Sequence, residues 1–221
     1  MSQIDALAHE LRPARGEPDD ALVLLHGRGT DQFDLLPLLD ELDPDRRLVA
    51  VTPRAPLELS PGGFHWYISR DVGYPDHDTF HRTYRLLAGW LDALPPALKV
   101  PWSRTVLGGF SMGAVMSYAV GLGNGRPAPA GILALSGFIP TLDDFALDLS
   151  GREGYPVAIG HGTHDPVISI DFAREARRRL QAARAHVLYR ESRMFHGIDP
   201  VFIHVLHNWL ADTIPPAETP A

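Results

Sequence analysis

A serine between two glycines is the first residue in this chain whose surroundings could support chemistry. Ser111 follows a short apolar run and precedes a helix-like pattern, with Gly109 and Gly113 two residues away on either side. At a tight strand-to-helix turn a serine hydroxyl stands clear of the backbone, and flanking glycines let the helix and strand approach. The free N–H groups at the helix start would face a developing anion. These features predict a nucleophile, although a helix N-cap serine fits the same residues.

Two later segments carry residues that could activate this serine. A serine hydroxyl needs a base to take its proton, and the base works best beside an acid that orients it. Asp165 and His196 each follow one of the last two predicted strands. Taken singly, Asp165 is a turn former before a proline and His196 a loop histidine. Together they predict a Ser111, Asp165 and His196 triad; Asp199 is the other candidate acid, but it shares the loop of His196.

Acyl transfer also requires donors for the oxyanion of the tetrahedral intermediate. The usual donors are the backbone N–H after the nucleophile and one from the loop after an early strand. In this chain they are the N–H groups of Met112 and, after His26 and Gly27, of Arg28. The alternative is that His26 and Gly27 are only a strand end with a flexible glycine.

Several histidines raise the question of a metal. His161 and His164 lie close to Asp165, but that carboxylate is better explained by the triad, and no further ligand cluster is evident. The remaining candidates form no recognised ligand spacing and are expected at polar loop or helix positions. These remaining histidines are His65, His77 and His81. We therefore predict no metal and no cofactor.

The elements that must position these residues alternate between strands and helices. This alternation predicts an α/β fold with a mostly parallel sheet and helices on both faces. The carboxyl ends of such strands form one rim, where ligands bind, and the predicted triad residues all leave the sheet there. A long stretch over 53–78 is rich in Pro, Gly and aromatic residues and is predicted to be a functional loop rather than disordered. Strands are predicted over 21–25, 47–52, 105–109, 130–136, 156–160 and 186–191.

The helices between these strands have recognisable starts. Asp31 or Asp34 is expected to cap a helix that ends at Leu42, and Asp78 or Thr79 a second helix. Further helices are predicted after Ser111 and near residues 172–183 and 201–209.

Composition narrows the class of protein. The chain has 221 residues, is 45% hydrophobic and carries a formal charge of −7, so we expect one domain over 1–214 with a flexible tail over 215–221 and no nucleic-acid partner. It contains no cysteine, which excludes disulfides and a thiol nucleophile. The start does not resemble a signal peptide, and no apolar run is long enough to span a membrane. A cytoplasmic location is therefore expected, without membrane insertion.

These motifs together resemble the phospholipase/carboxylesterase family of α/β-hydrolases. The resemblance implies Ser111 as nucleophile, His196 as base and Asp165 as its orienter. It also implies the hydrolysis of small to medium carboxylic esters or thioesters without a cofactor, and often a homodimer. The segments that carry it are Leu25-His26-Gly27-Arg28-Gly29, Phe64-His65-Trp66-Tyr67, Gly108-Gly109-Phe110-Ser111-Met112-Gly113-Ala114-Val115-Met116-Ser117, Leu135-Ser136-Gly137-Phe138-Ile139-Pro140, His161-Gly162-Thr163-His164-Asp165-Pro166-Val167 and His196-Gly197-Ile198.

Three departures from the family pattern concern the substrate pocket. Met112 stands where the family usually has glutamine, and Phe195 where it usually has glycine. Arg28 occupies a position that is often apolar in acyl-protein thioesterases, which suggests a preference for substrates that bear a carboxylate. Trp66 and Tyr67, together with Phe195, are candidates for the pocket wall, although the first two fit core packing equally well.

Two other functions stay open at the level of sequence. One is a hydrolase-fold module that binds a ligand without turnover, and the other is a related hydrolase of lactones or peptides.

Overall fold

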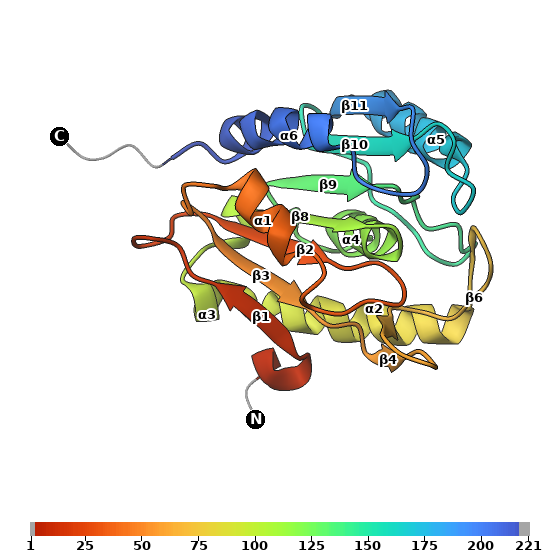
Figure 1. Cartoon of the computed structure of the whole chain (residues 1–221), viewed down its shortest axis with the longest axis horizontal. Coiled ribbons are helices and arrows are strands. Elements are labelled where there is room, and N and C mark those ends of the chain that lie inside the picture. Colours follow the sequence, from red (N-terminus) through yellow and green to blue (C-terminus); the bar gives the residue numbers. More distant parts are fainter. Residues whose placement is uncertain (1–2, 217–221) are drawn as a thin grey trace.

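A seven-stranded sheet forms the centre of the molecule (Figure 1). In the computed structural model, which describes residues 3–216, every neighbouring pair of its strands is parallel except the first, in which β1 runs antiparallel to β3. The predicted mostly parallel sheet is confirmed. In spatial order the strands are β1 (His9–Arg12), β3 (Val49–Pro53), β2 (Ala21–Leu25), β8 (Thr105–Phe110), β9 (Gly131–Leu135), β10 (Pro156–Gly162) and β11 (His186–Ser192).

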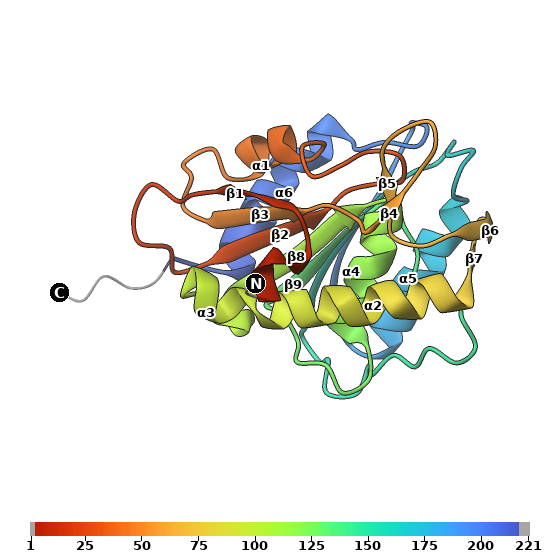
Figure 2. The ribbon, with the colours of Figure 1, turned by 90° about the horizontal axis from the view of Figure 1, so that it is seen from below.

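Helices cover both faces of this sheet (Figure 2). One face packs on α1 (Leu36–Leu42) and α6 (Pro200–Thr213). The other packs on α2 (His77–Asp92), α4 (Met112–Leu122) and α5 (Ile170–Ala182). Because both faces are covered, β2, β3 and β9 are buried along their whole length and read as unbroken apolar runs. The short elements η1 (Gln3–Ala6), α3 (Leu94–Leu98) and η2 (Trp102–Arg104) complete the helices.

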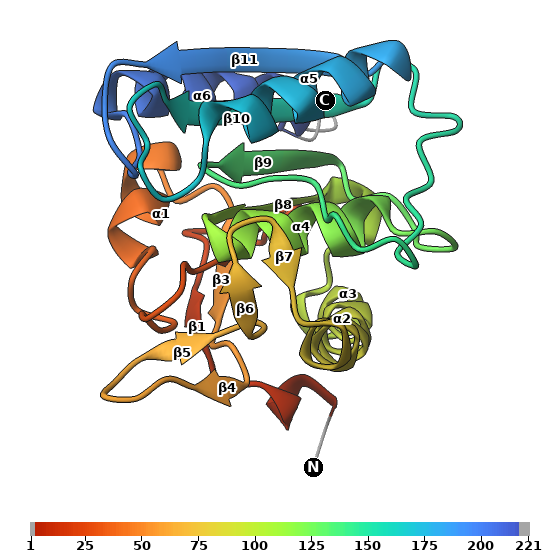
Figure 3. The same ribbon diagram turned by 90° about the vertical axis from the view of Figure 1, so that its right-hand side faces the viewer.

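The predicted functional loop over 53–78 contains two small hairpins (Figure 3). The first pairs β4 (Leu57–Glu58) with β5 (Phe64–His65), and the second pairs β6 (Ser69–Asp71) with β7 (Tyr74–Pro75). All three residues of β6 are exposed. The second hairpin leads directly into α2, so its position is tied to the start of that helix.

Two helix starts differ from the sequence prediction. Neither Asp31 nor Asp34 caps α1, which begins at Leu36 without a side-chain cap, because Asp31 accepts a hydrogen bond from the Phe33 N–H instead. Helix α2 begins earlier than predicted, with Asp76 accepting from the N–H of Thr79.

The predicted tail over 215–221 is only partly described. Residues 217–221 lie outside the described part of the chain, whereas the carbonyl of Pro215 accepts a hydrogen bond of 2.6 Å from Arg104. Within residues 3–216, no helix combines the length and apolar character needed to cross a membrane.

Candidate active site

The turn between β8 and α4 holds Ser111 in an unusual backbone conformation. Its φ is 54° and its ψ is −119°, which lifts the hydroxyl away from the helix that follows. The flanking glycines are required by packing. A Cβ on Gly113 would lie 1.9 Å from the carbonyl oxygen of Leu25, and one on Gly109 would lie 2.6 Å from the carbonyl carbon of Gly113. The strand–turn–helix predicted around Ser111 is present.

Three side chains from three strand ends form a hydrogen-bonded chain. The Oγ of Ser111 lies 2.9 Å from Nε2 of His196, and Nδ1 of His196 lies 2.7 Å from Oδ2 of Asp165. A carboxylate only accepts, so Nδ1 carries the proton and donates, which leaves Nε2 free to accept from the serine hydroxyl. This arrangement can remove a proton from Ser111 and hold it on the imidazole.

The side chain of Asp165 is fully buried, and its second oxygen is held by the backbone. Oδ1 accepts from the N–H groups of Val167 at 2.8 Å and Ile168 at 2.9 Å. Burial opposes ionisation of this carboxyl, but the hydrogen bonds from His196 and from these two N–H groups outweigh it and lower its pKa. The group is therefore an anion at neutral pH, as an orienting acid must be.

Asp199, the other candidate acid, has a different role. Its Oδ1 accepts from the N–H of Val201 at the start of α6, and its Oδ2 accepts from Arg190 and Ser192, both at 2.6 Å. It is the N-cap of that helix and makes no hydrogen bond to His196.

Two contacts that the sequence analysis missed hold the imidazole in place. The ring of Phe110 lies against that of His196, with 4.8 Å between the centroids. The hydroxyl of Ser136 donates a 2.9 Å hydrogen bond to the carbonyl of Gly197, the next residue after the histidine. The only sequence signal for Phe110 is its position directly before Ser111, which places it on the turn.

The loop after β2 passes beside the serine, since a Cβ on Gly27 would lie 3.6 Å from the Cβ of Ser111 and Arg28 lines the same cavity. His26 shapes this loop. Its Nε2 accepts from the Ala55 N–H at 3.0 Å, so its Nδ1 carries the proton and donates to the carbonyl of Gly27 at 2.7 Å. Burial lowers the pKa of His26 and keeps it neutral. The N–H of Met112 is the first of α4 and has no acceptor within the helix.

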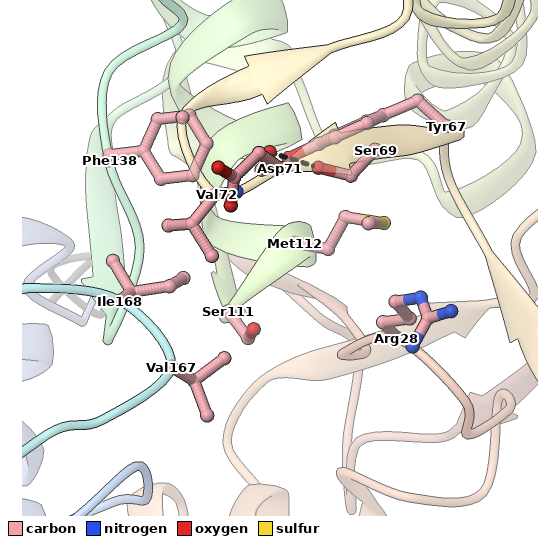
Figure 4. Close-up of a pocket in the computed structure, with 11 residues that line it drawn as sticks. Arg28, Tyr67, Ser69, Asp71, Val72, Ser111, Met112, Phe138, Val167 and Ile168 are labelled. Carbon is pink, nitrogen blue, oxygen red and sulfur yellow. Dashed lines mark hydrogen bonds between the residues drawn. The ribbon is translucent and has the colours of Figure 1, made fainter.

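Arg28, Ser111 and Met112 line one cavity of about 270 Å³ (Figure 4). Phe138, Val167 and Ile168 lie to one side of the serine, while the guanidinium of Arg28 lies on the other side. The cavity therefore has an apolar side and a cationic side. Its remaining lining comes from Tyr67 and from the second hairpin, through Ser69, Asp71, Val72 and Gly73.

Two of the three residues predicted for the pocket wall do not line this cavity. Trp66 is fully buried in the core, where its Nε1 donates to the carbonyl of His26 at 2.9 Å, so it supports the loop of Arg28 from behind. Phe195 is 72% exposed and lies outside the cavity, because the turn before His196 directs it to the surface. Tyr67 does contribute to the wall.

The histidines considered as metal ligands lie in two separate places, His161 and His164 near Asp165 and His77 and His81 near Asp144. His161 donates from Nε2 to the carbonyl of Ile168 at 2.8 Å and lies beside Asp165, whereas His164 contacts Thr163. Burial lowers the pKa of His161 and keeps it neutral. A different pair, His77 and His81, lies within 4.8 Å of a carboxylate oxygen of Asp144, a grouping that the sequence analysis did not anticipate.

Comparisons with known proteins identify the family of the chain. The family model for Phospholipase/Carboxylesterase matches residues 8–214. Acyl-protein thioesterase 1 of Candida albicans is 29% identical over 74% of this chain and 78% of its own length, and a putative hydrolase, MhqD, of Bacillus subtilis is 29% identical over 77% and 82%.

Solved structures show the same fold. The carboxylesterase of Bacillus cereus superimposes with a TM-score of 0.82 over 94% of both chains at 22% identity, and esterase PE8 with a TM-score of 0.81 over 94% of this chain and 99% of its own, at 25% identity. The expected fold and enzyme class are confirmed, and the chain belongs to the phospholipase/carboxylesterase family of α/β-hydrolases, a family of serine hydrolases.

Proposed function

We propose that the chain hydrolyses small to medium carboxylic esters, and thioesters with them, through a covalent acyl-enzyme. Ser111 is the nucleophile, His196 the general base and Asp165 the acid that orients it. The observation that carries the proposal is the hydrogen-bonded sequence of these three residues, of which Ser111 lines a cavity together with Arg28 and Met112.

In the first half of the reaction the enzyme is acylated. His196 takes the proton of the Ser111 hydroxyl on Nε2 while Oγ attacks the carbonyl carbon. The resulting oxyanion is held by the backbone N–H groups of Arg28 and Met112. The intermediate collapses when the imidazolium gives its proton to the departing alkoxide or thiolate, which leaves as an alcohol or thiol. Asp165 stabilises the imidazolium throughout.

In the second half a water molecule repeats these steps. His196 takes a proton from the water as its oxygen attacks the acyl carbonyl, and the same N–H groups hold the second oxyanion. Collapse breaks the bond to Ser111 Oγ, which regains the proton from His196. The carboxylic acid leaves, and no cofactor is consumed.

The two sides of the cavity suggest how substrates bind. The volume of about 270 Å³ is near the lower end for ligand pockets, which favours short chains. The apolar side formed with Phe138 and Ile168 suits an acyl chain. The guanidinium of Arg28 lies across the serine from it and suits a carboxylate on the alcohol part of the ester.

The Arg28 assignment is tested by the ratio of rates on matched esters. For Arg28→Ala we expect kcat/KM on a carboxylate-bearing ester to fall about tenfold relative to its neutral isostere. Arg54→Ala is the control, because that guanidinium lies over the Phe64 ring and does not line the cavity. An unchanged ratio in Arg28→Ala would remove the proposed role.

The central experiment is intact-mass spectrometry after incubation with a fluorophosphonate, alongside turnover of p-nitrophenyl esters of graded chain length. Wild type is expected to gain one adduct that Ser111→Ala lacks, and to turn over short acyl chains fastest. A folded wild type without an adduct would contradict the proposal and favour a binding module without turnover. An adduct with turnover only of lactones or peptides would place the chain in a different substrate class.

Two finer predictions concern the whole molecule. We propose that the chain is cytoplasmic and forms a homodimer; sedimentation velocity at micromolar concentration tests the second, and a single species at 24.3 kDa would contradict it.

A further inference from the structure

A cluster of metal-ligating side chains lies outside the active site, where α2 meets the segment between β9 and β10. His77 and His81 are one helical turn apart at the start of α2, so their rings lie on the same side of the helix, with 4.6 Å between centroids. Asp144 comes from the segment after β9, which passes beside that end of α2 (Figure 2). Its Oδ2 lies 2.7 Å from Nε2 of His77 and 3.1 Å from Nε2 of His81.

The Nε2 atoms of His77 and His81 both lie near one carboxylate oxygen, Oδ2 of Asp144. Nδ1 of His77 lies 3.0 Å from Oδ1 of Asp78, and since a carboxylate only accepts, this nitrogen carries a proton. A neutral His77 would then point the lone pair of Nε2 at Asp144. Two imidazole nitrogens and a carboxylate oxygen that converge in this way form a ligand set for a metal ion.

His81 supplies the observation that favours a metal. Its Nε2 is buried, and although it lies near Asp144, the geometry is out of line for a hydrogen bond; within the described residues it has no hydrogen-bond partner. A single ion between the three ligand atoms would satisfy all of them.

The cluster is also held in place before any ion binds. Asp78 orients His77, as carboxylates commonly do for the metal-binding histidines of proteins. Asp144 is fixed by the next residue: the ring of Phe145 packs against Phe80 and Tyr84 of α2 at 5.2 and 5.0 Å. Preorganisation of this kind reduces the cost of assembling a ligand set.

We propose that His77, His81 and Asp144 form a binding site for one Zn²⁺ ion per chain, with water in the remaining coordination position. Two imidazoles and one carboxylate match the ligand preference of this ion. Bonds of about 2.0–2.1 Å place tetrahedral ligand atoms roughly 3.3 Å apart. The three ligand atoms already lie within 4.8 Å of one another, so small side-chain rotations complete the site.

The position of the site gives it a consequence for the pocket. Helix α2 directly follows the second hairpin, which lines the cavity through Asp71, Val72 and Gly73. The hydroxyl of Thr141, three residues before Asp144, donates to the carbonyl of Gly73. A bound ion would therefore link α2 to the segment that also supports the hairpin. This link would slow movement of the hairpin away from the cavity. Two arginines that line the same depression, Arg82 and Arg85, reduce the affinity for a cation.

The test is calorimetric titration of untagged protein with Zn²⁺, together with Tm measured with and without the ion. Wild type is expected to bind one equivalent and gain Tm, and His77→Ala, His81→Ala and Asp144→Asn are each expected to weaken binding by more than about tenfold and to lose the Tm gain. Asp78→Asn is expected to weaken binding less, because it only orients His77.

A matched control comes from another surface pair. His204 and His207 share a depression on α6 with Glu41, so His204→Ala removes an exposed histidine without touching the cluster. It is expected to leave Zn²⁺ binding unchanged. The proposal is overturned if wild type shows no saturable binding, if the three ligand variants bind like wild type, or if binding is lost only in His204→Ala. Because binding is measured directly, these outcomes do not depend on ester hydrolysis.

Discussion

The two walls of the cavity are built differently. On one side, the segments after β10 and β11 are buried in part and tied together: the N–H groups of Thr163 and His164 donate to the carbonyls of Ser192 and Met194. On the other side, the second hairpin has two short strands and exposed side chains. The segments of the first wall carry Asp165 and His196, and the second wall carries no triad residue; Ser111 comes from the turn after β8. The contrast indicates that the sheet holds the reacting residues in place. Substitutions in the hairpin can change which substrates are accepted with little effect on the stability of the fold.

The largest effect is expected from the acid on the rigid wall. Asp165→Asn keeps the shape of the side chain, but its amide favours the wrong tautomer of His196, so kcat should fall by about 10⁴-fold. Asp199→Asn is the matched control, since asparagine still caps a helix, and its kcat should change by less than about threefold. Steady-state kinetics on a p-nitrophenyl ester measure both, and equal losses would assign the role of Asp165 to general stability instead.

The turn that carries the nucleophile should be nearly as sensitive to substitution. Gly113→Ala places a methyl group against the carbonyl of Leu25 and is expected to reduce the free energy of unfolding by about 3 kcal/mol, with loss of activity in the fraction that stays folded. Gly16→Ala has open space around the new methyl and should be near neutral. Urea denaturation compares them, and a stable, active Gly113→Ala would show that the helix can move away.

These predictions also show how far the sequence determines the structure. The parallel sheet follows from alternating apolar runs and helical stripes, and the meeting of Ser111, Asp165 and His196 follows from their positions at strand ends. The sequence left core packing and a pocket wall equally open for Trp66 and did not indicate the outward direction of Phe195, because both depend on how the chain between strands turns. The grouping of His77 with Asp144 spans 67 residues and rests on the docking of Phe145 onto α2, which no local pattern encodes.

The pH dependence of stability should reflect two buried histidines near the site. Burial lowers the pKa of His26 and of His161, so the unfolded chain binds more protons than the folded one as pH falls below about 6.5. Their contribution to stability is present above that pH and is lost as pH falls through the folded pKa values. Each histidine then adds up to about 1.4 kcal/mol per pH unit to the slope.

The measurement is the free energy of unfolding between pH 7.5 and 5. His26→Gln retains an acceptor for the Ala55 N–H but no titrating group, and its slope should be shallower than that of wild type. A slope equal to that of wild type would mean that His26 has the same pKa in the folded and the unfolded chain.

The smallest effect is expected on the hairpin. Asp71 lines the cavity and is exposed, and its negative charge opposes an anionic substrate. Asp71→Asn should raise kcat/KM for a carboxylate-bearing ester about threefold over its neutral isostere, with less effect at high salt. Asp45→Asn, on the exposed surface away from the cavity, should leave the ratio unchanged. A fall in kcat on both esters would assign the hairpin a role in the reaction itself.

The backbone at Ser111 also restricts which reactive residues this fold could have used over evolutionary time. The φ of 54° at this residue is strained for any side chain, and a β-branched residue tolerates it least. Threonine is therefore a poor substitute although it carries the same hydroxyl, whereas cysteine has the same unbranched shape as serine. Substitution at this position can thus replace the serine nucleophile with a cysteine, but not with a threonine, whose secondary alcohol other hydrolases use.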